Sequence, residues 1–125
     1  MGHHILVVDD DEGIIEVIQI VLEGEGYTVR TATNGDCLQS LTNDLPDLIL
    51  LDVLLSGDDG RDICKSLKSN PATKHIPVIM LSAHSDASKV AEAGGADGFL
   101  EKPFDVDALI DTVAKYLLPS QHLHI

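Results

Sequence analysis

Residues 5–12 read ILVVDDDE, an apolar and largely β-branched run that ends abruptly in acidic residues. Beyond Gly13, apolar residues recur at spacings of three and four, at Ile14, Ile15, Val17, Ile18, Val21 and Leu22. This spacing is typical of one helix face, whereas a short run without polar residues is typical of a strand buried on both sides. The stretch therefore predicts a buried strand that ends in acids and leads into an amphipathic helix.

The same unit recurs along the chain. We expect further strands at residues 28–32, 48–51, 77–81 and 99–100, and helices around residues 34–41, 61–69, 85–93 and 106–117. Continuous apolar strands that alternate with amphipathic helices predict an α/β fold, with a parallel sheet covered on both faces. Ligands of such sheets bind beyond the carboxyl ends of the strands, so the residues at those ends matter most for function.

The composition fits one acidic domain over residues 1–125. The chain carries 21 Asp and Glu against 8 Lys and Arg, a net charge of −13. A field of this sign repels nucleic acids and anionic membranes, so we expect direct contact with neither. The apolar runs are far shorter than the roughly 18 residues of a membrane span. The 2 cysteines lack C-x-x-C spacing, which predicts reduced thiols and a cytoplasmic location.

The strand ends place acids, a hydroxyl and a cation at one edge of the predicted sheet. Asp9 and Asp10 follow the first strand, Asp52 the third, Ser82 the fourth and Lys102 the fifth. Two carboxylates about 4 Å apart repel by about 1 kcal/mol in water and about 4 kcal/mol at an effective dielectric near 20, so the cluster favours a cation. Oxygen ligands favour Mg²⁺, and an Asp carboxylate is a known nucleophile toward phosphorus. The sequence therefore predicts magnesium-dependent phosphoryl chemistry.

Four segments together resemble one known family. They are residues 5–11 (ILVVDDD), Asp52 with Gly60 eight positions later, residues 79–83 (IMLSA) and residues 99–104 (FLEKPF). In this order and spacing they resemble the receiver domain of two-component response regulators, and the resemblance covers nearly the whole chain. It implies a flavodoxin-like, doubly wound sheet of five parallel strands in the order 2-1-3-4-5, with five helices and a core over about residues 3–118.

The resemblance also implies a role for each acidic strand end. Asp52 is expected to accept a phosphoryl group from a sensor histidine kinase or a phosphotransfer protein. Asp10 and Asp52 are expected to bind Mg²⁺, or Mn²⁺ in its place, together with the main-chain carbonyl of Leu54. Asp9 is expected to act mainly through water or hydrogen bonds.

A switch follows from the same resemblance. The residues expected to contact or sense the phosphoryl oxygens are Ser82, Ala83 and Lys102. Phe99 is expected to move inward when the Ser82 hydroxyl turns toward the phosphoryl group, although a role as core filler fits this aromatic equally well. A cis peptide bond is expected between Lys102 and Pro103. We hypothesise that His84 influences water access and hydrolysis.

The expected partners are proteins. In the family the output face is usually the last strand and the last two helices, here roughly residues 85–118, and we expect a downstream protein or an output domain to bind there. A phosphorylation-dependent homodimer is a further option. We expect a switch that takes up and slowly hydrolyses its own phosphoryl group, rather than a turnover enzyme.

Other functions fit the sequence less well. An aspartate-nucleophile phosphatase needs a general-acid Asp two residues after the nucleophile, where this chain has Leu54. A flavin or nucleotide carrier needs a phosphate-binding loop after the first strand, where residues 9–12 repel an anion. A degenerate receiver that acts as an unphosphorylated interaction module stays open as the main alternative.

Several residues have simpler interpretations. Asp11 and Glu12 fit acids that complement a helix N-terminus, and Cys37 and Cys64 fit small buried side chains. The histidines near the two ends of the chain lack enough companion ligands for a metal site. Ser56 stands where many relatives have Pro, which suggests a looser loop with added negative charge from the neighbouring residues 58–59.

Overall fold

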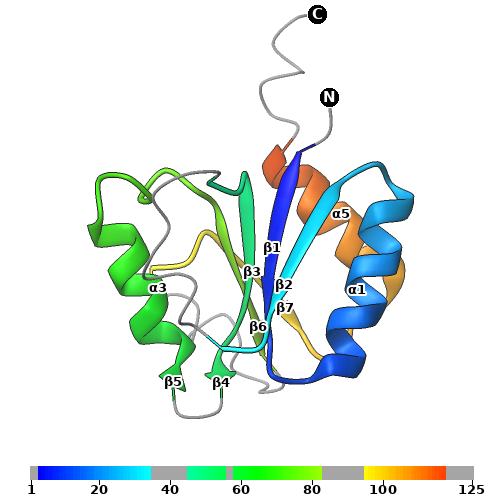
Figure 1. Ribbon diagram of the computed structural model, residues 1–125, viewed down its shortest axis with the longest axis horizontal. Helices are drawn as coiled ribbons and strands as arrows, with labels where there is room; N and C mark the ends of the chain where they lie inside the picture. The colour runs from blue at the N-terminus through cyan, green and yellow to red at the C-terminus, as the bar shows by residue number, and fades with distance from the viewer. Residues whose placement is uncertain (1–2, 35–44, 56–57, 83–94, 118–125) are drawn as a thin grey trace, which may run out of the picture.

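The computed structural model describes residues 3–34, 45–55, 58–82 and 95–117 (Figure 1). Its main sheet has five strands in the order β2-β1-β3-β6-β7, and each neighbouring pair is parallel. Counted along the chain, these strands confirm the predicted order 2-1-3-4-5. Their bounds are β1 (His4–Val8), β2 (Thr28–Ala32), β3 (Leu48–Asp52), β6 (Val78–Ser82) and β7 (Gly98–Glu101).

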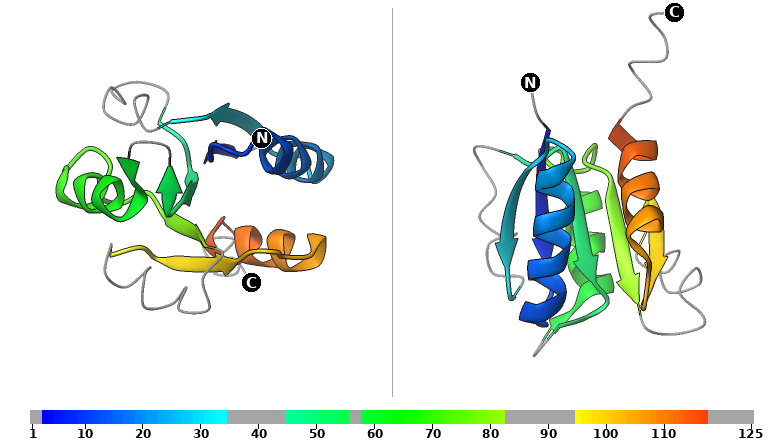
Figure 2. Two further views of the ribbon diagram at one scale, coloured as in Figure 1. Left: turned by 90° about the horizontal axis from the view of Figure 1, so that it is seen from below. Right: turned by 90° about the vertical axis from the view of Figure 1, so that its right-hand side faces the viewer.

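Helices cover both faces of this sheet (Figures 1 and 2). The helices α1 (Glu12–Gly24) and α5 (Val106–Leu117) lie on one face, and α3 (Gly60–Ser69) lies on the other. The helices expected around residues 34–41 and 85–93 fall almost wholly on residues outside the described ranges, so the count of five helices stays a prediction. Within the described ranges, no helix is long and apolar enough to cross a bilayer.

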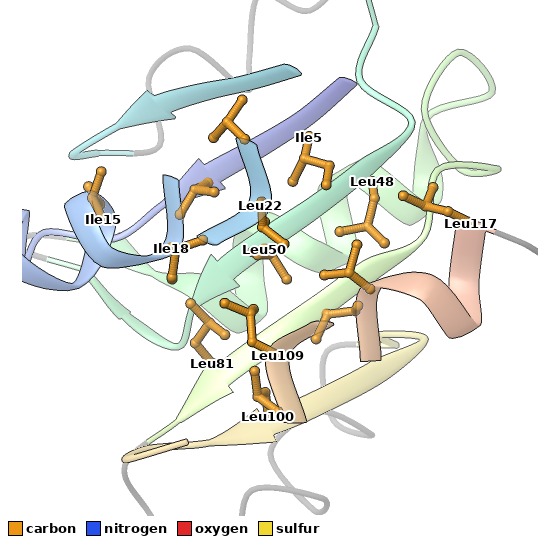
Figure 3. Close-up of a cluster of buried hydrophobic side chains, with 14 residues drawn as sticks. Ile5, Ile15, Ile18, Leu22, Leu48, Leu50, Leu81, Leu100, Leu109 and Leu117 are labelled. Atoms are coloured by element: carbon orange, nitrogen blue, oxygen red, sulfur yellow. The ribbon is translucent and has the colours of Figure 1, made fainter. Parts of the chain in front are cut away.

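The core explains why the strands lack polar alternation. Successive side chains of a strand point to opposite faces, and here both faces are buried. Leu48 and Leu50 belong to the cluster beneath α1 and α5, whereas Ile49 and Leu51 belong to the cluster beneath α3. Figure 3 shows the first cluster, in which Leu50 and Leu81 of the sheet lie among side chains of α1 and α5. Continuous burial of this kind leaves the strand ends as the place for polar chemistry.

The segment after β3 differs from the loop that the sequence predicts. Residues of β4 (Leu54–Leu55) pair antiparallel with those of β5 (Asp58–Asp59), and the amide of Gly60 closes the pair on the Val53 carbonyl at 2.7 Å. Such a short pair is set by backbone hydrogen bonds rather than by apolar alternation, so the sequence pattern did not reveal it. Ser56 lies outside the described residues, but Leu55 before it and Asp58 after it are paired.

Candidate metal and phosphoryl site

Three carboxylates converge where β1 and β3 end. Asp9 and Asp10 follow β1, Asp52 ends β3, and the neighbouring residues Val8 and Leu51 are register partners in the two strands. One carboxylate oxygen from each acid lies within 4.8 Å of those of the other two. Asp9 and Asp52 are buried, with 0% and 7% exposure, whereas Asp10 is exposed. The topology therefore brings together acids that stand far apart in the sequence.

Lys102 lies directly against two of these acids. Its Nζ is 2.8 Å from Oδ2 of Asp9 and 3.4 Å from Oδ1 of Asp52. Burial lowers the pKa of Lys102, but the hydrogen bond to Asp9 and the negative charges of Asp52 and Asp9 raise it more, so the net pKa lies above its ordinary value. The ammonium group is therefore charged at neutral pH and offsets part of the repulsion between the acids.

Asp9 is held from two sides. Its Oδ1 accepts a hydrogen bond from the Asp11 amide at 2.9 Å, and its Oδ2 accepts from Lys102 Nζ at 2.8 Å. Both contacts orient a fully buried carboxylate, which a protein interior tolerates only when it is paired. This geometry fits a carboxylate that supports the site through hydrogen bonds, while the neighbouring Asp10 is exposed.

The other predicted site residues lie on β4, β6 and β7, directly after β7, or outside the described ranges. Ser82 is buried and comes one residue after Leu81, which is the register partner of Asp52. The Ser82 carbonyl accepts a hydrogen bond from the Lys102 amide at 2.7 Å. Phe99 is 45% exposed on β7. The main chain of Leu54 begins β4, and the Lys102–Pro103 peptide bond is cis. Two further predicted residues, Ala83 and His84, lie outside the described ranges.

The donor set fits a small divalent cation. Carboxylate oxygens from two strand ends lie within 4.8 Å of each other, and one of the acids is open to solvent. Mg²⁺ prefers oxygen ligands, uses one or two carboxylates and keeps several waters for exchange with phosphate oxygens. Asp10 and Asp52 are the residues that would hold such an ion, with Asp9 beside them.

Comparison with known families assigns the chain. A family model described as the response regulator receiver domain matches residues 5–114. The chain belongs to this family. Receiver domains are signalling switches that serve as phosphoacceptors in two-component systems, so the predicted family and the general role are confirmed.

Individual relatives agree with this assignment. The receiver domain is 43% identical to the response regulator PleD of Caulobacter vibrioides over 84% of this chain and 24% of PleD. It is 42% identical to the DNA-binding response regulator MtrA of Mycobacterium tuberculosis over 90% of this chain and 50% of MtrA. The chain thus spans at most half the length of these two relatives.

Solved structures give the same fold. A putative response regulator from Chloroflexus aurantiacus superposes with a TM-score of 0.87 at 40% identity, covering 94% of this chain and 98% of that one. The chemotaxis protein CheY4 of Vibrio cholerae superposes with a TM-score of 0.84 at 28% identity, covering 93% and 99% of the two chains. These matches, together with the strand order, confirm the flavodoxin-like fold.

The receiver also contains a close backbone approach that sequence reasoning did not explain. A Cβ added to Gly60 would lie 2.1 Å from the Asp52 carbonyl oxygen and 2.9 Å from Val53 Cα. The first residue of α3 therefore lies directly against the backbone of the predicted acceptor, and only glycine fits there. The eight-residue spacing between Asp52 and Gly60 was the signal available in the sequence, but the spacing alone does not show that the two residues are in contact.

Asp59 has a structural role and does not simply add a free negative charge beside the site. It caps α3 by accepting from the Arg61 amide at 2.9 Å, and its carboxylate also pairs with the Arg61 guanidinium, with 2.7 Å between Nη2 and Oδ2. The side-chain hydrogen bond from Arg61 lowers the pKa of Asp59 although partial burial opposes the shift. The expected contribution of Asp59 to the field of the loop is therefore largely neutralised by Arg61.

Two simpler interpretations hold where the structure describes the residues. Asp11 caps α1, since its Oδ1 accepts from the amides of Gly13 at 3.0 Å and Ile14 at 3.3 Å. Cys64 is fully buried, and desolvation raises the pKa of its thiol to about 11. A thiol of this kind is unreactive at neutral pH. Cys37 lies outside the described residues.

Proposed function

We propose that this receiver domain accepts a phosphoryl group on Asp52 in a magnesium-dependent reaction and in response changes the surface of its last strand and last two helices, roughly residues 85–118. The observation that carries the proposal is the convergence of Asp9, Asp10 and Asp52 within 4.8 Å, with Lys102 Nζ against two of them. Acids and a cation gathered from three different strand ends contribute nothing to the packing of the apolar core beneath them.

The proposed transfer is a simple displacement at phosphorus. An Oδ atom of Asp52 attacks the phosphorus of a phosphohistidine, a P–O bond forms, the P–N bond breaks, and its electron pair returns to the imidazole nitrogen. Mg²⁺, when bound, supplies charge neutralisation at the phosphoryl oxygens. The Lys102 ammonium supplies a second positive charge at the same oxygens. Hydrolysis removes the group again: water attacks the phosphorus, the bond between Asp52 Oδ and phosphorus breaks, and inorganic phosphate is released.

Side chains at the ends of β6 and β7 are suited to sense the product. Ser82 is buried one residue beyond the register partner of Asp52, so its hydroxyl lies near the new phosphoryl oxygens once it turns toward them. Phe99 is 45% exposed, and the proposed switch turns its ring inward. A ligand shifts such an equilibrium only through stronger contacts with one state, and Ser82, Ala83 and Lys102 are the proposed source of those contacts.

The proposed partners and compartment follow from this role. A sensor histidine kinase or phosphotransfer protein donates the phosphoryl group, and a downstream protein or output domain binds around residues 85–118, with homodimerisation as an alternative output. His84 is proposed to tune hydrolysis. The protein is its own substrate and not a turnover enzyme, and we place it in the cytoplasm.

Intact mass after incubation with acetyl phosphate tests the proposal. Wild type with Mg²⁺ should gain one phosphoryl group, while wild type with EDTA and the Asp52→Asn variant should gain none. Asp47→Asn is a matched control, because it changes another acid beside β3 at the opposite end of the strand, and it should be phosphorylated like wild type. No adduct on wild type would instead support the unphosphorylated interaction module, and an equal adduct on Asp52→Asn would refute Asp52 as the acceptor.

A further inference from the structure

Asp97 closes a double hydrogen bond at the start of β7. Its amide donates to the Val78 carbonyl at 2.9 Å, and its carboxylate Oδ2 accepts from the Val78 amide at 2.8 Å. The regular pairing of β6 and β7 begins one residue later, at Ile79 and Gly98. The Asp97 side chain therefore acts as an extra backbone carbonyl that fixes how β7 aligns on β6.

Other elements hold the same residue. Lys68 of α3 places its Nζ 2.6 Å from Oδ2 of Asp97, and the same ammonium donates to the Ile76 carbonyl at 2.7 Å and the Lys74 carbonyl at 3.3 Å. These three acceptors match the three donors of a lysine. From the other face of the sheet, the Tyr116 hydroxyl of α5 donates to the Asp97 carbonyl at 2.7 Å. Helices on both faces thus converge on the residue that precedes β7.

β7 needs such a contact more than the central strands of the sheet do. It lies at the edge of the sheet (Figure 2). Of its four residues, only Leu100 is buried. A short strand with mostly exposed side chains specifies its register weakly. A slip of one residue would move Lys102 by about 3.3 Å along the sheet and reverse the face of each side chain. At the far end of the strand, Lys102 must reach Asp9 and Asp52 within 2.8 Å and 3.4 Å.

We propose that Asp97, held by Lys68, is a positioning residue for phosphoryl transfer: it fixes the register of β7 so that Lys102 reaches the acceptor site. Asp97 acts through about five residues of extended chain, or roughly 17 Å, and touches none of the reacting groups. The inference rests on the proposed function, because it assigns Lys102 to the phosphoryl oxygens.

The chain contains a matched control for this arrangement. Asp47 precedes β3 as Asp97 precedes β7, and it makes the same double hydrogen bond with His4 of β1, at 2.7 Å in each direction. β3, however, lies between β1 and β6, and all five of its residues are buried. The core already determines the register of β3, so loss of the Asp47 carboxylate should leave the site in place.

The experiment compares Asp97→Ala, Lys68→Met and Asp47→Ala by two readouts, Mg²⁺ affinity and the phosphorylation rate with acetyl phosphate. The metal acids lie at the ends of β1 and β3, so all three variants should still bind Mg²⁺, and none should bind it more weakly than wild type does. Asp97→Ala should slow phosphorylation by about tenfold to a hundredfold, the range that a displacement of about 1 Å in a catalytic group can produce. Lys68→Met, which leaves the bonds to Val78 intact, should slow it by a smaller factor. Asp47→Ala should keep the wild-type rate.

A double-mutant cycle with Lys102→Gln separates positioning from general destabilisation. If Asp97 acts through Lys102, adding Asp97→Ala to Lys102→Gln should change the rate by less than about twofold. The inference would be overturned if the two substitutions slowed phosphorylation independently, so that their effects on the rate multiply. It would also be overturned if Asp97→Ala reacted at the wild-type rate. If Asp97→Ala fails to fold, Lys68→Met in the same cycle decides, and a wild-type rate for that variant refutes the role of the ion pair. Failure of wild type to be phosphorylated would refute the proposed function instead.

Discussion

Gly60→Ala should destabilise this receiver, whereas the same substitution at a glycine with open space around it should not. The added Cβ would lie 2.1 Å from the Asp52 carbonyl oxygen and 3.0 Å from the Asp52 carbonyl carbon, whereas ordinary contacts begin at 3.4 Å. The obstacle is backbone at the end of a central strand, so it cannot rotate away as a side chain can. Either α3 moves outward and breaks the bond from the Gly60 amide to Val53, or the end of β3 moves.

The magnitude follows from two opposing effects. Forcing extra atoms into a filled space costs about 1–3 kcal/mol, while alanine gains up to about 1 kcal/mol over glycine in a helix. We expect a net loss of about 1–2 kcal/mol in the free energy of unfolding. With a urea dependence of about 1–3 kcal/mol per molar, the unfolding midpoint should fall by roughly 1 M.

The assay is urea unfolding combined with phosphorylation by acetyl phosphate. Gly24→Ala is the matched control, because Gly24 also lies in a helix and a Cβ there would meet nothing within 4 Å. That variant should be unchanged or slightly more stable and should be phosphorylated normally. Gly60→Ala should also react more slowly, since it displaces the backbone of Asp52. Equal stability and equal rates for the two variants would refute the reasoning.

Other predictions address single groups in the site and the core. Lys102→Gln should bind Mg²⁺ about tenfold more tightly or better, measured by calorimetry, because one positive charge beside Asp9 and Asp52 is worth about 1–4 kcal/mol; unchanged affinity would contradict the electrostatic role. Asp11→Ala should lose about 1 kcal/mol of stability with the cap of α1, and Asp11→Ser should recover most of it in thermal or urea unfolding. Cys64 has a folded pKa of about 11, raised from 9.0 by burial, so its contribution to stability is complete below about pH 9 and is lost as pH rises toward 11. Between these values the wild type should lose up to about 1.4 kcal/mol per pH unit more than Cys64→Ala, and parallel stability curves for the two proteins would exclude this effect.

The fold could be predicted because its strands are buried on both faces. Runs such as residues 48–51 leave no polar face, and this alone indicates a covered parallel sheet. The apolar runs at residues 5–8, 48–51 and 77–81 stop at Asp9, Asp52 and Ser82, and Lys102 follows the last run one residue beyond Glu101. The ends of these runs were therefore enough to indicate the four as candidate site residues. The strand order itself came from resemblance to a family, since periodicity does not determine which strands are neighbours.

The features that sequence reasoning missed depend on contacts between distant residues. Asp47 and Asp97 each stand one residue before an apolar strand, but nothing local reveals that their carboxylates bond the start of a neighbouring strand. The pairing of β4 with β5 and the capping of α3 by Asp59 likewise arise from backbone hydrogen bonds. An acidic residue directly before a strand is the sequence signal that could have indicated these hydrogen bonds. The same residue, however, fits the simpler interpretation of a solvent-exposed turn.

Trapping the acyl phosphate tests the central claim most directly. Borohydride reduces an aspartyl phosphate to homoserine, so reduction after incubation with acetyl phosphate, followed by peptide mass mapping, identifies the acceptor. The account predicts homoserine at position 52 in the presence of Mg²⁺ and unmodified Asp52 in EDTA. Homoserine at Asp9 or Asp10 instead, or equal modification of Asp52 without a divalent ion, would contradict it.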